Sequence, residues 1–192
     1  PEEIAEVLAI HAGHDSYTEV YERAGILVPR TIMAHCIHLS EREFDMLRDT
    51  DTRIAHCPSS NFFLKSGRFD LRRAEEKGIR FGLGSDVGAG PSFSLCDVMK
   101  AMNYMQPFHI RPQQAYYCAT LGNASLLGID DVTGSLDPGK DADFLILDVH
   151  RNNPDFVYSN VEDLLAFLIY LGNENYIEAA HVRGRRLELF RE

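Results

Sequence analysis

The chain has 192 residues, of which 45% are hydrophobic and 25% charged, a composition typical of a soluble globular protein. Its formal net charge of -10 argues against binding to nucleic acid or to an acidic membrane, because such binding depends on clustered Lys and Arg. No apolar run reaches the roughly 18 residues of a membrane-spanning helix. We therefore expect neither nucleic acid nor membrane as a partner.

The chain has four cysteines that lie far apart and form no C-x-x-C pair: Cys36, Cys57, Cys96 and Cys118. They could be reduced thiols of a cytosolic protein or thiolate ligands of a metal. Zinc-thiolate sites usually carry closely spaced pairs of ligands. The spacing therefore favours buried free thiols and a cytoplasmic location.

The first residues predict two helices, over about 2–12 and 16–24. Pro1 and the two glutamates after it suit a first helical turn, where proline is tolerated and acidic side chains favour the helix dipole. Because the sequence opens directly into a helix without an initiator Met, we expect the chain to be cut or processed from a longer protein.

Short apolar segments alternate with amphipathic ones from residue 30 to about residue 125. We expect strands at 30–36, 52–58 and 79–86, and helices at 39–51, 71–78, 92–105 and 111–128. The strands are apolar on both faces, which is typical of parallel strands covered by helices on both sides. This α/β pattern predicts either part of an open doubly wound sheet or the last portion of an eight-stranded (β/α)8 barrel.

Local signals set several of these boundaries. Ser40 and Glu43 have the spacing of a capping box at the start of a helix. Pro58 ends the second strand, and residues 59–70 are expected to form a loop. Ser92 is the expected N-cap of the helix that follows the third strand.

The last part of the chain, residues 131–192, has a different character. An Asp-Pro-Gly turn precedes an alternating strand at 142–147, a helix follows at about 161–171, and two strands joined around Gly184 are expected over 177–189. We therefore divide the chain into an α/β part, residues 1–130, and a smaller β-rich unit, residues 131–192.

Three polar side chains lie at the carboxyl ends of the expected strands: His35, His56 and Asp86. Functional sites of parallel α/β folds are built at this edge. His56 is interpreted as a core histidine that braces the following loop. His35 could be either a core histidine or a site residue. Asp86 favours a function, because a buried carboxylate requires a metal, a cation or several hydrogen-bond donors.

Glycines surround Asp86 in the stretch GLGSDVGAG. Gly82, Gly84, Gly88 and Gly90 remove side-chain bulk, so we expect a ligand to approach the backbone closely. A phosphate-binding loop is excluded, because the Lys-Ser/Thr pair is missing and Asp86 would repel phosphate.

Four stretches of the sequence resemble successive landmarks of the amidohydrolase superfamily, in its deaminase and chlorohydrolase branch. They are TIMAHCIHLSEREF, IAHCPSSN, GIRFGLGSDVGAG and ATLGNASLLGIDDVTGSLDPGKDADFLILD. The closing FLIYLGNENYIEAAHVRGRRL is similar to the C-terminal signature of the guanine deaminases. The opening helical segment resembles the insertion that those enzymes carry after the fifth barrel strand.

The resemblance implies a (β/α)8 barrel with one bound Zn²⁺ and a composite β-sandwich. Asp86 matches the eighth-strand metal ligand, which also accepts the proton of the attacking water. His35 matches the sixth-strand histidine that contacts this water or the substrate. The implied reaction is hydrolytic deamination of a purine, guanine, by an enzyme of the cytoplasm that is commonly a homodimer.

The family's H-x-H pair and its fifth-strand H-x-x-E do not occur in this sequence. The chain thus resembles the C-terminal half of a guanine deaminase, and we expect it to bind metal poorly and to be inactive alone. His11 and His14 are not assigned as replacement ligands, and His181 has no assigned role. Other hydrolases of the branch, acting on adenosine or s-triazines, and a non-catalytic structural half remain alternatives.

Overall fold

The computed structural model describes residues 2–151 and 153–188. Its strands are β1 (Ile32–Ala34), β2 (Arg53–His56), β3 (Phe81–Leu83), β4 (Phe144–Leu147), β5 (Ile177–Val182) and β6 (Arg185–Arg186). Its α-helices are α1 (Glu2–Ile10), α2 (Tyr17–Arg23), α3 (Glu41–Asp49), α4 (Pro58–Phe63), α5 (Leu71–Glu76), α6 (Leu95–Met105), α7 (Pro112–Ala119), α8 (Leu121–Leu127) and α9 (Val161–Leu171). The predicted helical position of Pro1 and the end of the last predicted strand, Leu189, lie outside the described residues.

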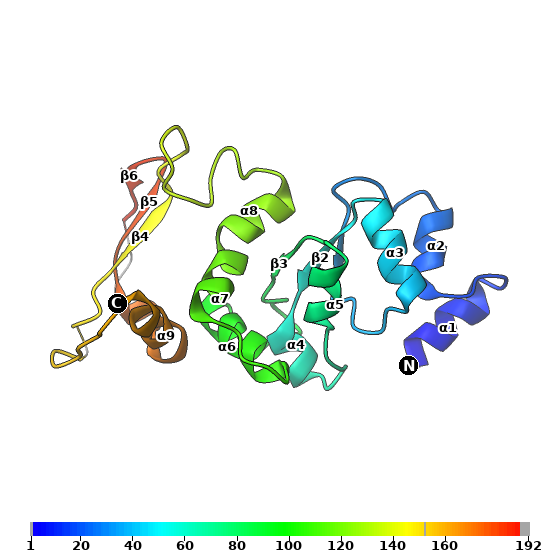
Figure 1. Ribbon diagram of the computed structural model, residues 1–192, viewed down its shortest axis with the longest axis horizontal. Coiled ribbons are helices and arrows are strands. Elements are labelled where there is room, and N and C mark those ends of the chain that lie inside the picture. Colours follow the sequence, from blue (N-terminus) through cyan, green and yellow to red (C-terminus); the bar gives the residue numbers. More distant parts are fainter. Residues whose placement is uncertain (1, 152, 189–192) are drawn as a thin grey trace.

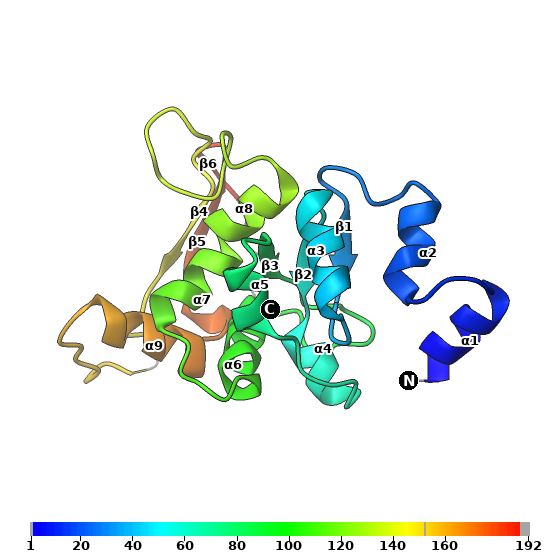
Figure 2. The ribbon, with the colours of Figure 1, turned by 45° about the vertical axis from the view of Figure 1, so that its right-hand side comes forward.

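The strands form two separate sheets. β1, β2 and β3 are parallel, with β2 in the centre, whereas β4, β5 and β6 form an antiparallel sheet. The antiparallel sheet with α9 lies at one end of the molecule, and α1 and α2 lie at the other (Figures 1 and 2). The prediction of three parallel strands followed by helices is confirmed.

The main hydrophobic core surrounds the parallel sheet. Ile54 of β2, Leu71 of α5 and Val98 of α6 are fully buried in it. The ring of Phe69 lies between those of His56 and Phe81, with centroids 4.9 and 6.0 Å away. Burial of a large apolar side chain contributes about 1.5 to 3 kcal/mol, so this core fixes the sheet whose carboxyl edge is considered below.

The capping box at the start of α3 is confirmed. The Glu43 backbone N–H donates to Ser40 Oγ at 3.3 Å, and the Ser40 N–H donates to Glu43 Oε2 at 2.8 Å. The Thr18 N–H also donates to Glu43 Oε1, at 3.4 Å, which joins α2 to α3. Burial of Glu43 raises its pKa, but the hydrogen bonds from Ser40 and Thr18 outweigh this effect and leave the pKa below its usual value.

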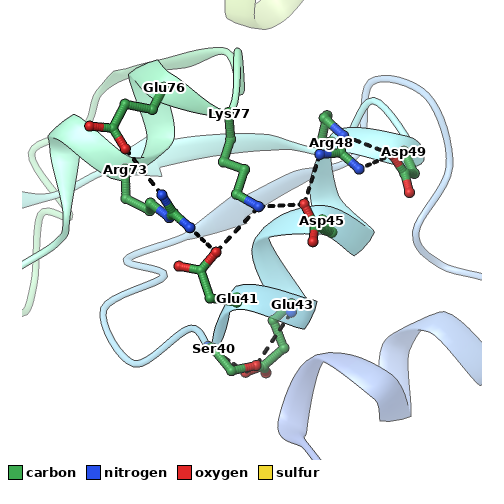
Figure 3. Close-up of polar contacts among 9 residues, drawn as sticks. All are labelled: Ser40, Glu41, Glu43, Asp45, Arg48, Asp49, Arg73, Glu76 and Lys77. Atoms are coloured by element: carbon green, nitrogen blue, oxygen red, sulfur yellow. Dashed lines mark hydrogen bonds and ion pairs between the residues drawn. The ribbon is translucent and has the colours of Figure 1, made fainter.

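A network of charged side chains joins α3 to α5 (Figure 3). Lys77 Nζ lies 2.6 Å from Asp45 Oδ1 and 3.3 Å from Glu41 Oε2, and Arg73 also donates to Glu41. Most of these carboxylates are well exposed to solvent, so each pair contributes little to stability. We refer to Glu41, Asp45, Arg73 and Lys77 as the α3–α5 network.

Two differences from the predicted elements lie after β2 and in the segment 111–128. Residues 58–63 form helix α4 where a loop was expected. Pro58 occupies its first turn, and the three residues after it are buried, so tertiary packing stabilises a segment of modest helix propensity. The single helix expected at 111–128 is divided at Thr120, whose backbone leaves the helical region with φ -121° and ψ -98°.

The N-cap of α6 is Ser94, two residues later than predicted. The Ser92 hydroxyl instead donates to Asp97 Oδ2 at 2.6 Å and accepts from the Ser94 N–H at 3.0 Å. Ser92 therefore supports the segment that leads into the helix without being its N-cap.

The side chain of Asn123 in α8 contacts the edge of β3 that no strand of the described residues pairs with. Asn123 Oδ1 accepts from the Leu83 N–H at 2.8 Å, and Nδ2 donates to the Leu83 carbonyl at 3.0 Å. These two bonds satisfy backbone groups that point away from β2. A Cβ at Gly82 would collide with Asn123 Oδ1, so this close approach requires glycine.

The C-terminal unit packs onto the α/β part through α9. Ile169 belongs to the main core, and the Tyr170 hydroxyl accepts from Asn103 Nδ2 at 2.6 Å. Phe167 and Leu168 instead form a second apolar cluster with Tyr176. Because α9 serves both clusters, the division into residues 1–130 and 131–192 stays a prediction.

The turn between β5 and β6 occurs where it was expected. Arg183 and Gly184 both have positive φ, of 50° and 73°, as a tight two-residue hairpin requires. Across residues 2–151 and 153–188, none of the helices combines the length and the apolar character needed to cross a membrane.

Candidate active site

The structure brings together two of the predicted site residues, His35 and Asp86. His35 follows β1 directly, and Asp86 lies three residues after β3. Their side chains approach each other across the end of β2, with His35 Nε2 3.7 Å from Asp86 Oδ2. The side chains are 39% and 32% exposed, so a small molecule can reach both.

The backbones of both residues lie in the left-handed region, which residues other than glycine rarely adopt. The φ angle is 66° at His35 and 50° at Asp86. Backbone hydrogen bonds hold these conformations: the His35 N–H donates to the Ala55 carbonyl, and the Asp86 carbonyl accepts from Ala89 and Gly90. Each such conformation costs on the order of 1 kcal/mol or more and occurs preferentially at functional sites.

Two residues of α4 contact this pair. The Ser60 hydroxyl donates to Asp86 Oδ2 at 2.6 Å, and His35 Nδ1 donates to Asn61 Oδ1 at 2.8 Å. Ser60 and Asn61 are 0% and 1% exposed. The sequence reasoning missed both, because it treated residues 59–70 as a loop; the available signal was a polar run directly after the end of a buried strand.

His56 does not join the other two residues. It is fully buried, and its ring packs against Phe69. Neither ring nitrogen has a hydrogen-bond partner among the described residues. Burial, assisted by the nearby His35, lowers its pKa to about 3, so the ring is neutral. His56 is a core residue, as interpreted, but it does not brace the loop through hydrogen bonds.

The glycines near Asp86 make room for the protein itself, and the expectation that all four admit a ligand is wrong. A Cβ at Gly90 would collide with the Ser85 carbonyl oxygen, and one at Gly84 would lie 3.1 Å from Cys57 Sγ. Gly82 accommodates Asn123, as described above. Gly88 has φ of 110° with open space around it, so it serves the turn after Asp86.

The four cysteines are free thiols, as predicted. Cys57 and Cys118 are buried, while Cys36 and Cys96 are half-buried. Burial raises the pKa of Cys36 to about 12 and that of Cys57 to about 11. Protonated thiols are poor metal ligands, which agrees with the preference for free thiols.

A metal ion is the group that the donor atoms of the pair suit best. Within the part of the chain that the structure describes, no cluster of three or more His, Cys, Asp or Glu could hold such an ion. Asp86 nevertheless offers a carboxylate oxygen of the kind that zinc takes in proteins. The 3.7 Å separation between His35 Nε2 and Asp86 Oδ2 places the histidine where it can contact a group held by the aspartate.

His11 and His14 lie beyond α1, at the end of the molecule that Figure 2 shows apart from the parallel sheet. His14 Nδ1 contacts the carbonyl of His11 at 2.8 Å. Neither histidine lies near His35 or Asp86, as expected from the sequence.

Polar side chains gathered at the carboxyl edge of parallel strands are the arrangement in which enzymes of α/β fold build their active sites. The chain belongs to the amidohydrolase family, whose sequence profile matches residues 1–173.

Within this family the chain is similar to guanine deaminases. It is 36% identical to the guanine deaminase of Escherichia coli K12, over 96% of this chain and 44% of that relative. The solved structure "E. coli Guanine Deaminase" aligns with a TM-score of 0.92, and "Guanine Deaminase from C. acetobutylicum with bound guanine in the active site" aligns with a TM-score of 0.87. The two solved chains are 35% and 32% identical to this chain. Each alignment covers 97% of this chain, but only 45% of the first solved chain and 46% of the second.

The chain thus spans less than half the length of the relatives it matches. The predicted resemblance to one half of a guanine deaminase is confirmed. Of the two architectures that the sequence left open, the structural relatives favour the amidohydrolase fold.

Proposed function

We propose that the protein catalyses the hydrolytic deamination of guanine to xanthine and ammonia, with zinc as cofactor. In this proposal β1, β2 and β3 are strands six, seven and eight of a (β/α)8 barrel, and β4, β5 and β6 are part of a composite β-sandwich. The remaining zinc ligands come from a part of the enzyme outside this chain. The proposal includes a cytoplasmic homodimer, which is inferred from the family resemblance.

The observation that carries this proposal is the approach of His35 Nε2 to Asp86 Oδ2, 3.7 Å apart at neighbouring strand ends. Both backbones lie in the left-handed region, and both side chains are accessible. The identity to guanine deaminases over nearly the whole chain supports guanine as the substrate.

Asp86 is the proposed metal ligand and proton acceptor. Its Oδ2 accepts from Ser60, so Oδ1 is free of that bond. When bound, zinc supplies a nucleophile at neutral pH, because it lowers the pKa of a coordinated water to about 7. As water adds to the amino-bearing carbon of guanine and a C–O bond forms, the Asp86 carboxylate accepts the proton of the water. A proton is then delivered to the amino group by an acid of the part of the enzyme outside this chain, the C–N bond breaks, and ammonia leaves.

His35 is proposed to orient the attacking water. Asn61 Oδ1 can only accept, so the hydrogen bond to it requires a proton on Nδ1. The lone pair of Nε2 then faces the reaction site and accepts a hydrogen bond from water. Orientation by such a group removes part of the entropy cost of the reaction.

The test uses the full-length gene product, loaded with zinc and assayed for ammonia release from guanine, adenosine, cytosine and a chlorotriazine. We expect turnover of guanine with formation of xanthine. If the enzyme turns over another of these substrates faster than guanine, that substrate takes the place of guanine in the proposal. Turnover of none of them, in a protein that binds no zinc, would overturn the catalytic proposal and favour a non-catalytic structural role.

A further inference from the structure

Helix α4 starts from the end of the central strand of the parallel sheet. β2 has β1 on one side and β3 on the other, so the first turn of α4 lies between the ends of both neighbours. Two consecutive residues of this turn each contact one of the proposed site residues: Ser60 contacts Asp86, and Asn61 contacts His35. We propose that Ser60 and Asn61 are positioning residues that orient Asp86 and His35 for the reaction. This inference deepens the proposed function and rests on it.

The Ser60 contact selects which oxygen of Asp86 is available. A hydroxyl has one hydrogen to donate, and at 2.6 Å it is directed to Oδ2. The carboxylate therefore cannot rotate freely about its last bond, and Oδ1 is presented in a fixed direction. Hydrogen bonds to metal-ligating carboxylates orient the ligand in this way.

The Asn61 contact selects the tautomer of His35. If the proton of the neutral ring were on Nε2, the Nδ1 lone pair and Asn61 Oδ1 would face each other at 2.8 Å, and the two acceptors would repel. Asn61 therefore holds the proton on Nδ1 and leaves Nε2 as the atom that faces Asp86. A histidine in water prefers the opposite tautomer, so a loss of Asn61 has a spectroscopic consequence.

The surroundings of α4 make these contacts rigid. The Asn61 N–H donates to the Cys57 carbonyl, and the Asn61 carbonyl accepts from Ser66, each at 3.0 Å. The helix packs against α6, and the neighbouring Ser59 is also buried. Among the described residues, Ser59 Oγ has no hydrogen-bond partner, so Ser59 differs from Ser60 in lacking a contact with the site.

The Ser60 part is tested in the full-length, zinc-loaded enzyme with Ser60→Ala, and Ser59→Ala serves as the matched control in the same turn. We expect Ser60→Ala to lower kcat and zinc affinity by about 10- to 100-fold with KM changed less than about threefold. Ser60→Thr, which keeps the hydroxyl, should restore most of the activity. Thermal melting of each variant shows whether it is folded. Equal effects of Ser59→Ala and Ser60→Ala would overturn this part.

The Asn61 part is tested by ¹⁵N NMR of the histidine rings, with the His35 signals assigned through a His35→Gln variant. The wild type should show a protonated Nδ1, and Asn61→Ala should shift the proton to Nε2 and lower kcat by about tenfold or more. An unchanged tautomer in Asn61→Ala would overturn the inference. This readout needs no substrate, so it decides the Asn61 part even if the protein fails to deaminate guanine.

Discussion

The α3–α5 network and the contacts of α4 with the site are both polar, but they differ in burial. The α3–α5 network has four charged side chains, of which the two carboxylates are exposed and the two cationic ones half-buried, and each side chain has more than one partner (Figure 3). Ser60 and Asn61, which are neutral and almost fully buried, each make a single hydrogen bond to the site: Ser60 donates to Asp86, and Asn61 accepts from His35. Solvent screens the former, whereas loss of one of the latter leaves a polar group without its partner. We therefore expect function and stability to depend more on the buried contacts than on the more numerous ion pairs.

The largest expected effect is that of Asp86→Asn on catalysis. The amide keeps an oxygen that can accept from Ser60, but it neither ligates zinc as an anion nor accepts a proton. We expect kcat for guanine to fall by about 10²- to 10⁴-fold, with a Tm within about 3 °C of the wild type. Steady-state kinetics and thermal melting of the full-length enzyme measure both. A kcat within tenfold of the wild type would remove Asp86 from the mechanism.

Asn123→Ala extends the comparison to a third place, where a half-buried neutral side chain makes hydrogen bonds to the buried Leu83. The variant leaves the Leu83 N–H and carbonyl without partners at the edge of β3. We expect a loss of about 2 to 4 kcal/mol in the free energy of unfolding. Urea denaturation measures it, with Asn175→Ala as the control, because Asn175 is exposed and should change stability by less than about 0.5 kcal/mol. Equal losses in the two variants would contradict the role given to Asn123.

A smaller, pH-dependent effect is expected for Glu43→Gln. Hydrogen bonds from Ser40 and Thr18 hold the pKa of Glu43 below its usual value of 4.5 in the folded state. The ionised side chain therefore stabilises the fold above about pH 4.5, and this contribution is lost as the pH falls through the folded pKa. The wild type should exceed Glu43→Gln in Tm by a few degrees at pH 7, and the difference should shrink below pH 4.5. A difference that grows on acidification would show that the carboxylate is not stabilised as an ion.

The sequence predicted the parts of the molecule that depend on local pattern. Short apolar runs revealed the three parallel strands, and the position of His35 and Asp86 at strand ends revealed the pair that the structure brings within 3.7 Å. Helix α4 could not be predicted in this way, because its six residues have modest helix propensity and are held by packing against α6. The contact of Asn123 with Leu83 joins residues forty positions apart, which no local pattern reveals. Gly82 and Gly84 were misjudged for the same reason, since their close neighbours, Asn123 and Cys57, are distant in sequence.

The smallest effect is expected where ion pairs are most numerous. Lys77→Met removes the contacts with Asp45 and Glu41, while the long apolar stem of the side chain is replaced by one of similar size (Figure 3). Arg73 still pairs with Glu41, and Arg48 with Asp45, so neither carboxylate loses its last cationic partner. We expect Tm to fall by no more than about 2 °C at low salt, and by less at 1 M NaCl, where the Debye length is only about 3 Å. A loss of 5 °C or more that salt does not reduce would show that the α3–α5 network behaves like a buried contact and would remove the distinction between the two regions.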